Sequence, residues 1–222
     1  MTSVIQLDKI SKKYDTSSLV LNEISYTFEE GQFYGIVGPS GAGKTTLLNL
    51  LGILDNVTSG EIFILNKRIS CATAKEKALI RNRHIGFVFQ SFFLNKNLTA
   101  IENVMLPLLI TNQSFSQCQK KAEALLSDIG LEKRLTHFPN QLSGGEQQRI
   151  AIARALVTNP DIIIADEPTG NLDPQNEEKI MHIFLNLAKQ TNKTIIMATH
   201  NNTLLSEMDH LLKLDKGILQ KL

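Results

Sequence analysis

The chain has 222 residues, a formal net charge of +1 and 42% apolar residues. Its length suits one large α/β domain or a core with a smaller subdomain, and its apolar content excludes a disordered chain. Lysines and arginines are scattered among acids rather than gathered in a basic stripe, so we expect no nucleic-acid partner.

Strands and helices alternate in the predicted order of elements. Alternating or continuous β-branched patterns predict strands over residues 4–10, 19–28 (one strand or two), 33–37, 60–65, 85–89, 162–165 and 194–199, with a small strand pair around 215–217. Helical spacing predicts helices over residues 45–54, 72–83, 98–110 (interrupted by Pro107), 116–129, 143–157 and 177–190.

This order predicts an α/β fold with a largely parallel sheet. The middle of the chain, residues 91–159, is almost all helical, and we interpret it as a helical subdomain inserted into a core formed by residues 1–90 and 160–222. With no Pro- or Ser-rich linker, residues 1–222 are expected to form a single domain.

The sequence has no signal for secretion, disulfides or a membrane span. Cys71 and Cys118 are far apart and form no metal-binding or redox motif. Residues 1–6 do not resemble a signal peptide, and no segment reaches the roughly 18 apolar residues of a membrane span. We therefore expect a cytoplasmic protein that a partner holds if it works at a membrane.

A glycine-rich loop follows the strand predicted over residues 33–37. Residues 38–45 read Gly-Pro-Ser-Gly-Ala-Gly-Lys-Thr, a match to Gly-x-x-x-x-Gly-Lys-[Ser/Thr] that arises by chance in on the order of one such chain in a hundred. Glycines allow successive N–H groups to face one anion, and the following helix adds its positive end. We expect Lys44 to reach the β- and γ-phosphates of ATP and Thr45 to offer its hydroxyl to Mg²⁺.

Two carboxylates end a fully apolar strand at Asp166 and Glu167. An acidic pair in this position is often only a strand end. With a phosphate loop in the same chain, however, Asp166 suits Mg²⁺, directly or through water, and Glu167 can orient or deprotonate the attacking water.

A second anion site is possible at residues 142–149, Leu-Ser-Gly-Gly-Glu-Gln-Gln-Arg. By its chemistry alone this segment is a helix start with exposed N–H groups, and taken by itself it favours an ordinary capped helix. Two such features are puzzling because one γ-phosphate needs only one loop.

The whole chain resembles the nucleotide-binding subunit of an ATP-binding-cassette (ABC) transporter. The matching segments are residues 38–45 (Walker A), Gln90 (Q-loop), residues 142–148 (signature), residues 162–167 (Walker B), residues 171–173 (D-loop) and His200 (switch). The resemblance implies a P-loop NTPase (RecA-like) core with an N-terminal antiparallel β subdomain and an inserted α-helical subdomain.

The resemblance also implies a head-to-tail dimer of two copies with two ATP molecules between them. One copy would contribute Tyr14, which stacks on adenine, and the loop residues Gly38, Pro39, Ser40, Gly41, Ala42, Gly43, Lys44, Thr45 and Thr46. The other copy would contribute the signature residues Ser143, Gly144, Gly145, Glu146 and Gln147. An ordinary strand-end tyrosine remains the alternative for Tyr14.

The remaining roles follow from the same resemblance. Glu167, His200, Gln90 and Lys44 would be catalytic, and Thr45, Gln90 and Asp166 would serve Mg²⁺. Gln90 would also link the site to the helical subdomain, and Asp173 would cross the dimer interface.

Segments 90–94, 98–104, 106–108 and 170–173 resemble the lipoprotein-release, macrolide-exporter and antimicrobial-peptide-resistance ATPases. This subgroup implies an integral-membrane permease partner and a place on the inner face of the cell membrane. Phe92, Phe93 and Leu94 would either help to form a groove for a permease helix or pack inside the helical subdomain.

Two other classes are alternatives: an importer-type ATPase, and a soluble cassette ATPase acting on DNA or ribosomes. No long coiled coil lies between Gln90 and Ser143, and only one cassette is present, both of which disfavour the soluble class. A small-molecule kinase would not explain residues 142–148.

Overall fold

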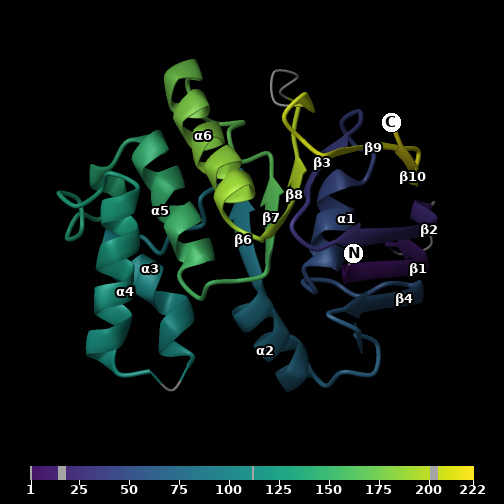
Figure 1. Cartoon of the computed structure of the whole chain (residues 1–222), viewed down its shortest axis with the longest axis horizontal. Coiled ribbons are helices and arrows are strands. Elements are labelled where there is room, and N and C mark those ends of the chain that lie inside the picture. The colour runs from purple at the N-terminus through teal and green to yellow at the C-terminus, as the bar shows by residue number, and fades with distance from the viewer. Residues whose placement is uncertain (1, 15–18, 112, 201–204) are drawn as a thin grey trace.

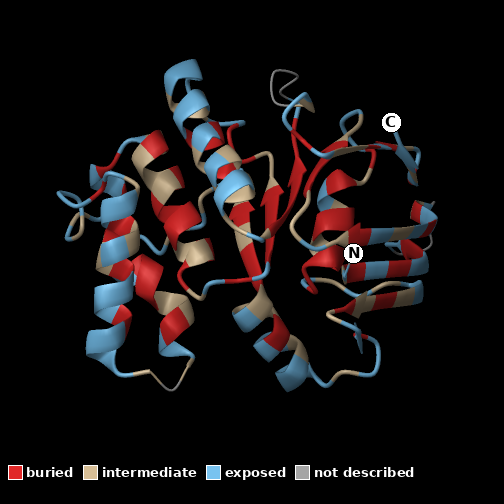
Figure 2. Cartoon of the chain, in the orientation of Figure 1, coloured by how far each residue is buried: buried red, intermediate tan, exposed pale blue. Residues whose placement is uncertain are grey.

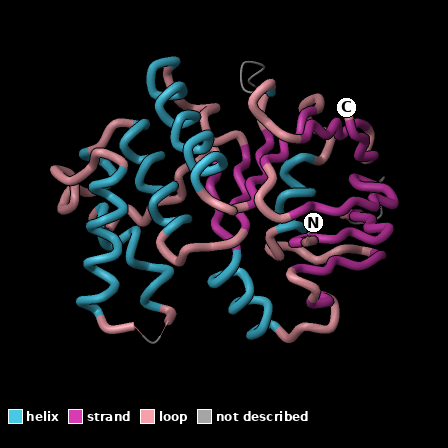
Figure 3. The backbone as a smooth tube through the Cα atoms, in the orientation of Figure 1, coloured by secondary structure: helices cyan, strands magenta, loops and turns pink. Residues whose placement is uncertain are grey.

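The computed structural model describes residues 2–14, 19–111, 113–200 and 205–222. Its strands form two sheets. Helices gather at the end of the molecule opposite the smaller sheet (Figures 1 and 3). The smaller sheet is antiparallel, with the order β2-β1-β4-β5. Its strands are β1 (Ser3–Lys13), β2 (Leu19–Glu29), β4 (Ser59–Ile64) and β5 (Lys67–Arg68).

The larger sheet has the order β10-β9-β3-β8-β7-β6, in which every neighbouring pair except β10 and β9 is parallel. Its strands are β3 (Phe33–Val37), β6 (Ile85–Phe89), β7 (Ile162–Asp166), β8 (Thr194–Ala198), β9 (His210–Asp215) and β10 (Ile218–Lys221). Parallel neighbours bring the ends of β3, β7 and β8 to one edge of the sheet.

Both faces of the central strands β3, β7 and β8 are buried, which explains their continuous apolar sequences. Alternate residues of a strand point to opposite faces. Ile162 and Ile164 belong to the cluster with α1 (Lys44–Leu51) and the smaller sheet, whereas Ile163 and Ala165 belong to the cluster with α6 (Pro174–Gln190). Figure 2 shows the buried strands in the centre and exposed residues on the outer side of α6.

The helical end has its own apolar cluster, formed by α3 (Ala100–Leu109), α4 (Phe115–Asp128) and α5 (Gly144–Leu156). Fully buried Val104, Ala122 and Ile150 come from the three helices in turn. Burying a large apolar side chain contributes about 1.5–3 kcal/mol, so these contacts hold the helices together. The 3₁₀ turn Pro139–Gln141 leads into α5, and α2 (Ala74–His84) leads into β6.

The expected fold class is confirmed, with an antiparallel β part and a helical insertion on a parallel core. Residues 19–28 belong to one strand rather than two. Pro107 does not interrupt its helix, because it lies near the end of α3, where little of the helix remains to be broken. Helix α6 begins at Pro174 rather than residue 177, because Asp173 caps it and proline suits the first turn.

The tail contains the expected strand pair, but β9 also pairs with β3 inside the main sheet. Across the described ranges, no helix is both long and apolar enough to cross a bilayer.

Candidate nucleotide-binding site

The glycine loop connects β3 to the first residue of α1. Gly41 and Gly43 have φ values of 77° and 100°, which residues other than glycine adopt only with strain. Gly38 has no room for a side chain, since an added Cβ would lie 2.1 Å from the carbonyl oxygen of Leu214 on β9. The loop therefore needs glycine for its turns and for its close approach to the sheet.

Lys44 lies across this loop with a side chain only 7% exposed. Its ammonium group donates to the carbonyl oxygens of Gly38, at 2.9 Å, and Pro39, at 3.2 Å, and lies 3.9 Å from Glu167 Oε1. A buried cation with two neutral acceptors and one carboxylate at a distance suits a site that receives an anion.

Thr45 and Asp166 meet at the end of β7. Burial raises the pKa of Asp166, and the nearby charge of Glu167 raises it further, against a hydrogen bond from Thr45 and the charge of Lys44. A hydroxyl beside a carboxylate is the donor set that Mg²⁺ prefers, so these two residues fit the ion. Among the described residues, no group of three or more His, Cys, Asp or Glu side chains is placed to hold a metal ion.

Glu167 lies between Lys44 and His200. His200 Nε2 is 2.6 Å from Glu167 Oε1, and the Glu167 N–H donates to the carbonyl oxygen of Ala198 at 3.0 Å. Glu167 has a φ of 46°, a conformation that costs a residue with a side chain about 1–2 kcal/mol. The neighbouring parallel strands β7 and β8 thus place the predicted base and switch histidine together.

Gln90, directly after β6, makes contact with the D-loop. Its Nε2 donates to Asn171 Oδ1 at 3.3 Å, and Asn171 Nδ2 donates to the Gln90 carbonyl oxygen at 3.1 Å. Gly170 packs against this amide, since an added Cβ would lie 2.8 Å from Gln90 Nε2. No contact in the described part of the chain joins Gln90 to Thr45 or Asp166, so its expected metal role stays a prediction.

The signature segment forms the N-terminus of α5. Ser143 accepts a hydrogen bond from the Glu146 N–H at 3.3 Å, and Glu146 Oε2 accepts one from the Ser143 N–H at 2.8 Å, which makes a capping box. Arg134 donates to Glu146 Oε1 at 2.8 Å, and Gln147 donates to the Leu142 carbonyl oxygen at 3.0 Å. The Gly144 and Gly145 N–H groups begin the helix behind Ser143.

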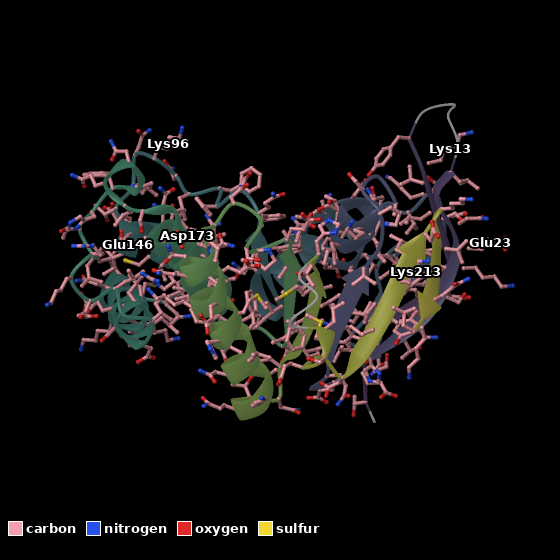
Figure 4. All side chains as sticks on the ribbon, turned by 90° about the horizontal axis from the view of Figure 1, so that it is seen from above. Lys13, Glu23, Lys96, Glu146, Asp173 and Lys213 are labelled. Carbon is pink, nitrogen blue, oxygen red and sulfur yellow. The ribbon has the colours of Figure 1, made fainter. Side chains whose placement is uncertain are left out.

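The N-termini of α5 and α6 lie side by side. A Cβ on Gly145 would lie 2.4 Å from Asn176 Oδ1, and Asp173 caps α6 by accepting from the Asn176 N–H at 3.0 Å. In Figure 4, Glu146 and Asp173 lie together at the helical end, and Lys13, the residue before Tyr14, lies at the opposite end. Helices α5 and α1 also lie on opposite sides of β7 and β8 (Figure 1).

Tyr14 lies just after β1 and is 43% exposed. Its phenol donates to Asp55 Oδ2 at 2.9 Å, and the Lys12 ammonium lies 4.7 Å from the centre of its ring. The tyrosine is therefore an exposed ring with a fixed anchor.

Gln148 and Asn103 are among the buried polar residues whose contacts sequence reasoning missed. Gln148 is fully buried and donates to the carbonyl oxygens of Phe89, at 3.3 Å, and Pro168, at 2.6 Å. Its position four residues before buried Ile152 on α5 was the available signal. Asn103 is also fully buried and joins its side chain to the backbone of residues 95–99.

A groove of about 900 Å³ lies between α2, α3 and β6. It is lined mainly by apolar side chains, among them Leu79, Phe87 and Ile110, with Lys75 and Arg81 also present. Phe92, Phe93 and Leu94 do not line it. Leu94 packs on the helical cluster. The exposed ring of Phe93 forms a T-shaped contact with Phe89, a groove residue, with the two ring centres 5.2 Å apart.

The sequence matches the ABC transporter family over residues 21–170, which is more than half of the chain. The chain belongs to the ABC transporter family. As an ABC ATPase it binds ATP with Mg²⁺, hydrolyses ATP and serves as the ATP-binding subunit of a transporter that has a membrane permease.

Relatives of this ABC ATPase cover nearly the whole chain. It is 44% identical over 220 residues to the lipoprotein-releasing system ATP-binding protein LolD of Rickettsia typhi, covering 98% of this chain and 97% of that protein. The LolD protein of Cytophaga hutchinsonii is 42% identical, with 99% of this chain and 100% of that protein covered.

Among solved structures, the ABC ATPase resembles the ATP-binding cassette MJ0796 in a dimeric state bound to ADP and phosphate. The TM-score is 0.89 and the identity 40%, with 98% of each chain covered. The cassette cbiO1 of Clostridium perfringens, part of a cbiONQ transporter complex, matches with a TM-score of 0.88 and 26% identity over 99% of this chain and 88% of that chain.

Proposed function

We propose that this ATPase lies at the inner face of the cell membrane, bound to a permease, and drives an export or mechanotransmission cycle of the lipoprotein-release type. Relatives named as lipoprotein-releasing ATPases from separate bacteria support this subgroup over the whole chain. A cytoplasmic position suits a chain whose described helices include none able to span a bilayer.

The phosphates of ATP bind in the glycine loop, residues 38–46. Backbone N–H groups and the N-terminus of α1 face the phosphates, and the ammonium group of Lys44 turns from the Gly38 and Pro39 carbonyls toward the γ-phosphate. Thr45 and Asp166, with Gln90, hold Mg²⁺, which when bound neutralises phosphate charge.

Hydrolysis depends on Glu167, His200 and Lys44. Glu167 accepts a hydrogen bond from the attacking water and orients it toward the γ-phosphorus, and His200, already 2.6 Å from the Glu167 carboxylate, holds that carboxylate and contacts the phosphate. Little covalent work falls to the protein in phosphoryl transfer, so position and charge supply most of the rate.

The signature of one copy completes the site of the other. The observation that carries this proposal is the separation of the two anion-binding segments: α1 with its loop and α5 with Ser143 lie on opposite sides of β7 and β8. A head-to-tail pair places Ser143, Gly145 and their neighbours on the γ-phosphate held by the partner. The dimeric form of MJ0796 supports this arrangement.

Residues 91–159 act as a subdomain that moves with the permease. Gln90 begins this segment and contacts Asn171 of the D-loop, and Asp173 lies at the dimer-facing end of α6. A permease segment docks in the groove between α2 and α3, which has the apolar lining that a helix face requires. Nucleotide state and permease position are thereby linked through β6.

The trapped dimer of Glu167→Gln tests the proposal. Without the carboxylate, ATP binds but the water is not oriented, so we expect a stable dimer with ATP on size-exclusion chromatography and a loss of hydrolysis of about 100-fold or more. Adding Ser143→Arg to the same chain places a bulky side chain at the partner's phosphate and should return the protein to monomer.

The parental chain with ADP is the reference for the monomer position. Hydrolysis by Glu167→Gln at the parental rate would show that Glu167 is not the base. A double variant that still dimerises with ATP would show that the signature does not complete the partner's site.

A further inference from the structure

A small cluster of charged and polar groups surrounds Tyr14, and it does not belong to the phosphate site. Asp55 lies in the turn between α1 and β4 and accepts three hydrogen bonds. Oδ2 accepts one from the Tyr14 phenol at 2.9 Å, and Oδ1 accepts one from the Lys12 ammonium at 2.8 Å and one from the Asn56 N–H at 2.7 Å. The Lys12 ammonium also donates to the carbonyl oxygen of Asn56 at 2.7 Å. One carboxylate therefore joins the end of β1 to the turn after α1.

Lys12 is held more tightly than a surface lysine. Its side chain is 10% exposed, whereas that of Asp55 is 30% exposed. Its ammonium lies 4.7 Å from the centre of the Tyr14 ring, within the range of a cation–π contact. Desolvation raises the pKa of Asp55, but hydrogen bonds from Lys12, Tyr14 and the Asn56 N–H outweigh it, so the carboxyl stays ionised at neutral pH.

The anchor fixes the ring relative to the phosphate loop. Helix α1 begins at Lys44 and ends at Leu51, and the turn that follows bonds back to it through the Leu54 and Asp55 N–H groups, which both donate to the Asn49 carbonyl oxygen. One rigid helix thus has the phosphate loop at its start and the anchor of Tyr14 just beyond its end.

We propose that Asp55 is a positioning residue for adenine: it holds the Tyr14 ring, through the phenol and Lys12, so that the ring face opposite Lys12 stacks on the base. This inference rests on the adenine contact of Tyr14, which the family resemblance implies and which we include in the proposed function. A ring already held in place loses little freedom on binding, which increases affinity without a new contact to the ligand.

Binding of ADP and of pyrophosphate, each with Mg²⁺, distinguishes the contribution of the base from that of the phosphates, because only ADP contains adenine. Neither ligand is hydrolysed by this reaction. We expect Asp55→Ala and Tyr14→Phe each to weaken ADP binding by about three- to tenfold, the range for ordering one freed side chain. Pyrophosphate binding should be unchanged. Calorimetry on the full chain measures both dissociation constants.

The two substitutions remove one interaction, so their effects should not add. We expect Tyr14→Phe with Asp55→Ala to bind ADP no more weakly than Asp55→Ala alone. Asp55→Asn should bind ADP nearly as well as the parental chain, because its amide oxygen can face Lys12 while its NH₂ donates to the phenol oxygen.

Glu61→Ala is the matched control. Glu61 lies on β4 of the smaller sheet, to which β1 also belongs. Like Asp55, its carboxylate accepts hydrogen bonds from one cation, Arg68 at 2.7 Å, and from one hydroxyl, Ser70 at 2.6 Å. No contact between Glu61 and Tyr14 is seen in the described structure. This variant should bind both ligands as the parental chain does.

Three results would overturn the inference, and each would show a different part of it to be wrong. Weakened ADP binding in Tyr14→Ala with none in Asp55→Ala would remove the role of Asp55 and leave that of Tyr14. Equal weakening of ADP and pyrophosphate in Asp55→Ala would show a general structural role. Unchanged ADP binding in Tyr14→Ala would show that the proposed adenine contact itself is wrong, and the role of Asp55 with it.

Discussion

Asp166 and Glu167 are adjacent carboxyl groups with different partners. Glu167 lies against His200 and near Lys44, whereas Asp166 accepts a hydrogen bond from the Thr45 hydroxyl. Burial and the neighbouring charge of Glu167 raise the pKa of Asp166. The ionised form of this carboxyl therefore destabilises the folded protein when no nucleotide is bound. A cation bound beside Asp166 would offset this destabilisation, which favours cation binding at this position.

Replacing Asp166 with Asn should therefore stabilise the nucleotide-free protein at pH 7. A group whose pKa is raised by folding contributes stability below its unfolded pKa and loses it as the pH rises through the folded pKa. We expect a Tm about 1–3 °C higher, because 1 kcal/mol moves the Tm of a chain this size by about 2–4 °C and water screens part of the charge.

The difference should fade as the pH falls below 3.8, the ordinary pKa of aspartate, because the carboxyl of Asp166 is then protonated and neutral like the amide of the variant. With Mg²⁺ and ADP the order of the two Tm values should reverse, since the variant has lost the proposed metal ligand. A variant that is less stable than the parental chain in both conditions would show that Asp166 stabilises the fold.

At the scale of elements, Gln148 connects α5 to two loops at once. Its amide donates to the last residue of β6 and to the residue after Glu167, and its Oε1 is buried without a partner in the described structure. Two carbonyl acceptors around one amide determine its orientation. The signature helix is thereby fixed to the backbone on both sides of the catalytic edge.

Gln148→Leu should lower the free energy of unfolding by about 2–4 kcal/mol. The leucine leaves the Phe89 and Pro168 carbonyls unpaired in a dry interior, where each unmade bond costs about 1–3 kcal/mol, partly offset by removal of the unpaired Oε1. Urea unfolding measures the loss. Gln147→Leu, which removes one bond to the partly buried start of the same helix, should cost less than 1 kcal/mol, about the net value of one hydrogen bond; equal losses would contradict the role of Gln148.

The sequence predicted most elements because local patterns determine them. The strands Phe33–Val37 and Ile85–Phe89 have the expected ends, since each is a short apolar run with a polar residue or a glycine directly before and after it. The glycine loop and the acids after β7 were equally local. Contacts between distant segments could not be predicted in this way. The hydrogen bonds of Gln148, Asn103 and Asp55 depend on the tertiary structure, and no spacing pattern in the sequence indicates them.

At the scale of the whole molecule, the groove between α2 and α3 is the proposed connection between the nucleotide site and the permease. Ile110 is 71% exposed at this groove, which is unusual for a large apolar side chain without a partner protein. Strand β6 forms one wall and leads directly to Gln90, so movement at the groove reaches the catalytic edge through one strand.

Ile110→Asp should separate permease binding from catalysis. The substitution adds a charge to an apolar docking surface, and because the residue is exposed the fold should tolerate it. We expect co-purification with the permease to fall at least tenfold while the ATPase activity of the isolated chain is unchanged. Ile218→Asp, on an exposed position of β10, is the control and should retain the permease; loss in both variants, or in neither, would exclude the groove as the docking site.

The position of β3 between β8 and β9 has a consequence for the order of synthesis. β3 has no neighbour in its own sheet until the ribosome has made residues 194–198, and the carbonyl of Leu214 that packs on Gly38 comes later still. The phosphate loop is thus among the first parts of the chain to be translated and among the last to take its final shape. A nascent chain should gain affinity for ATP only near the end of translation, and pairing over such long sequence separations makes this a slow, late folding step.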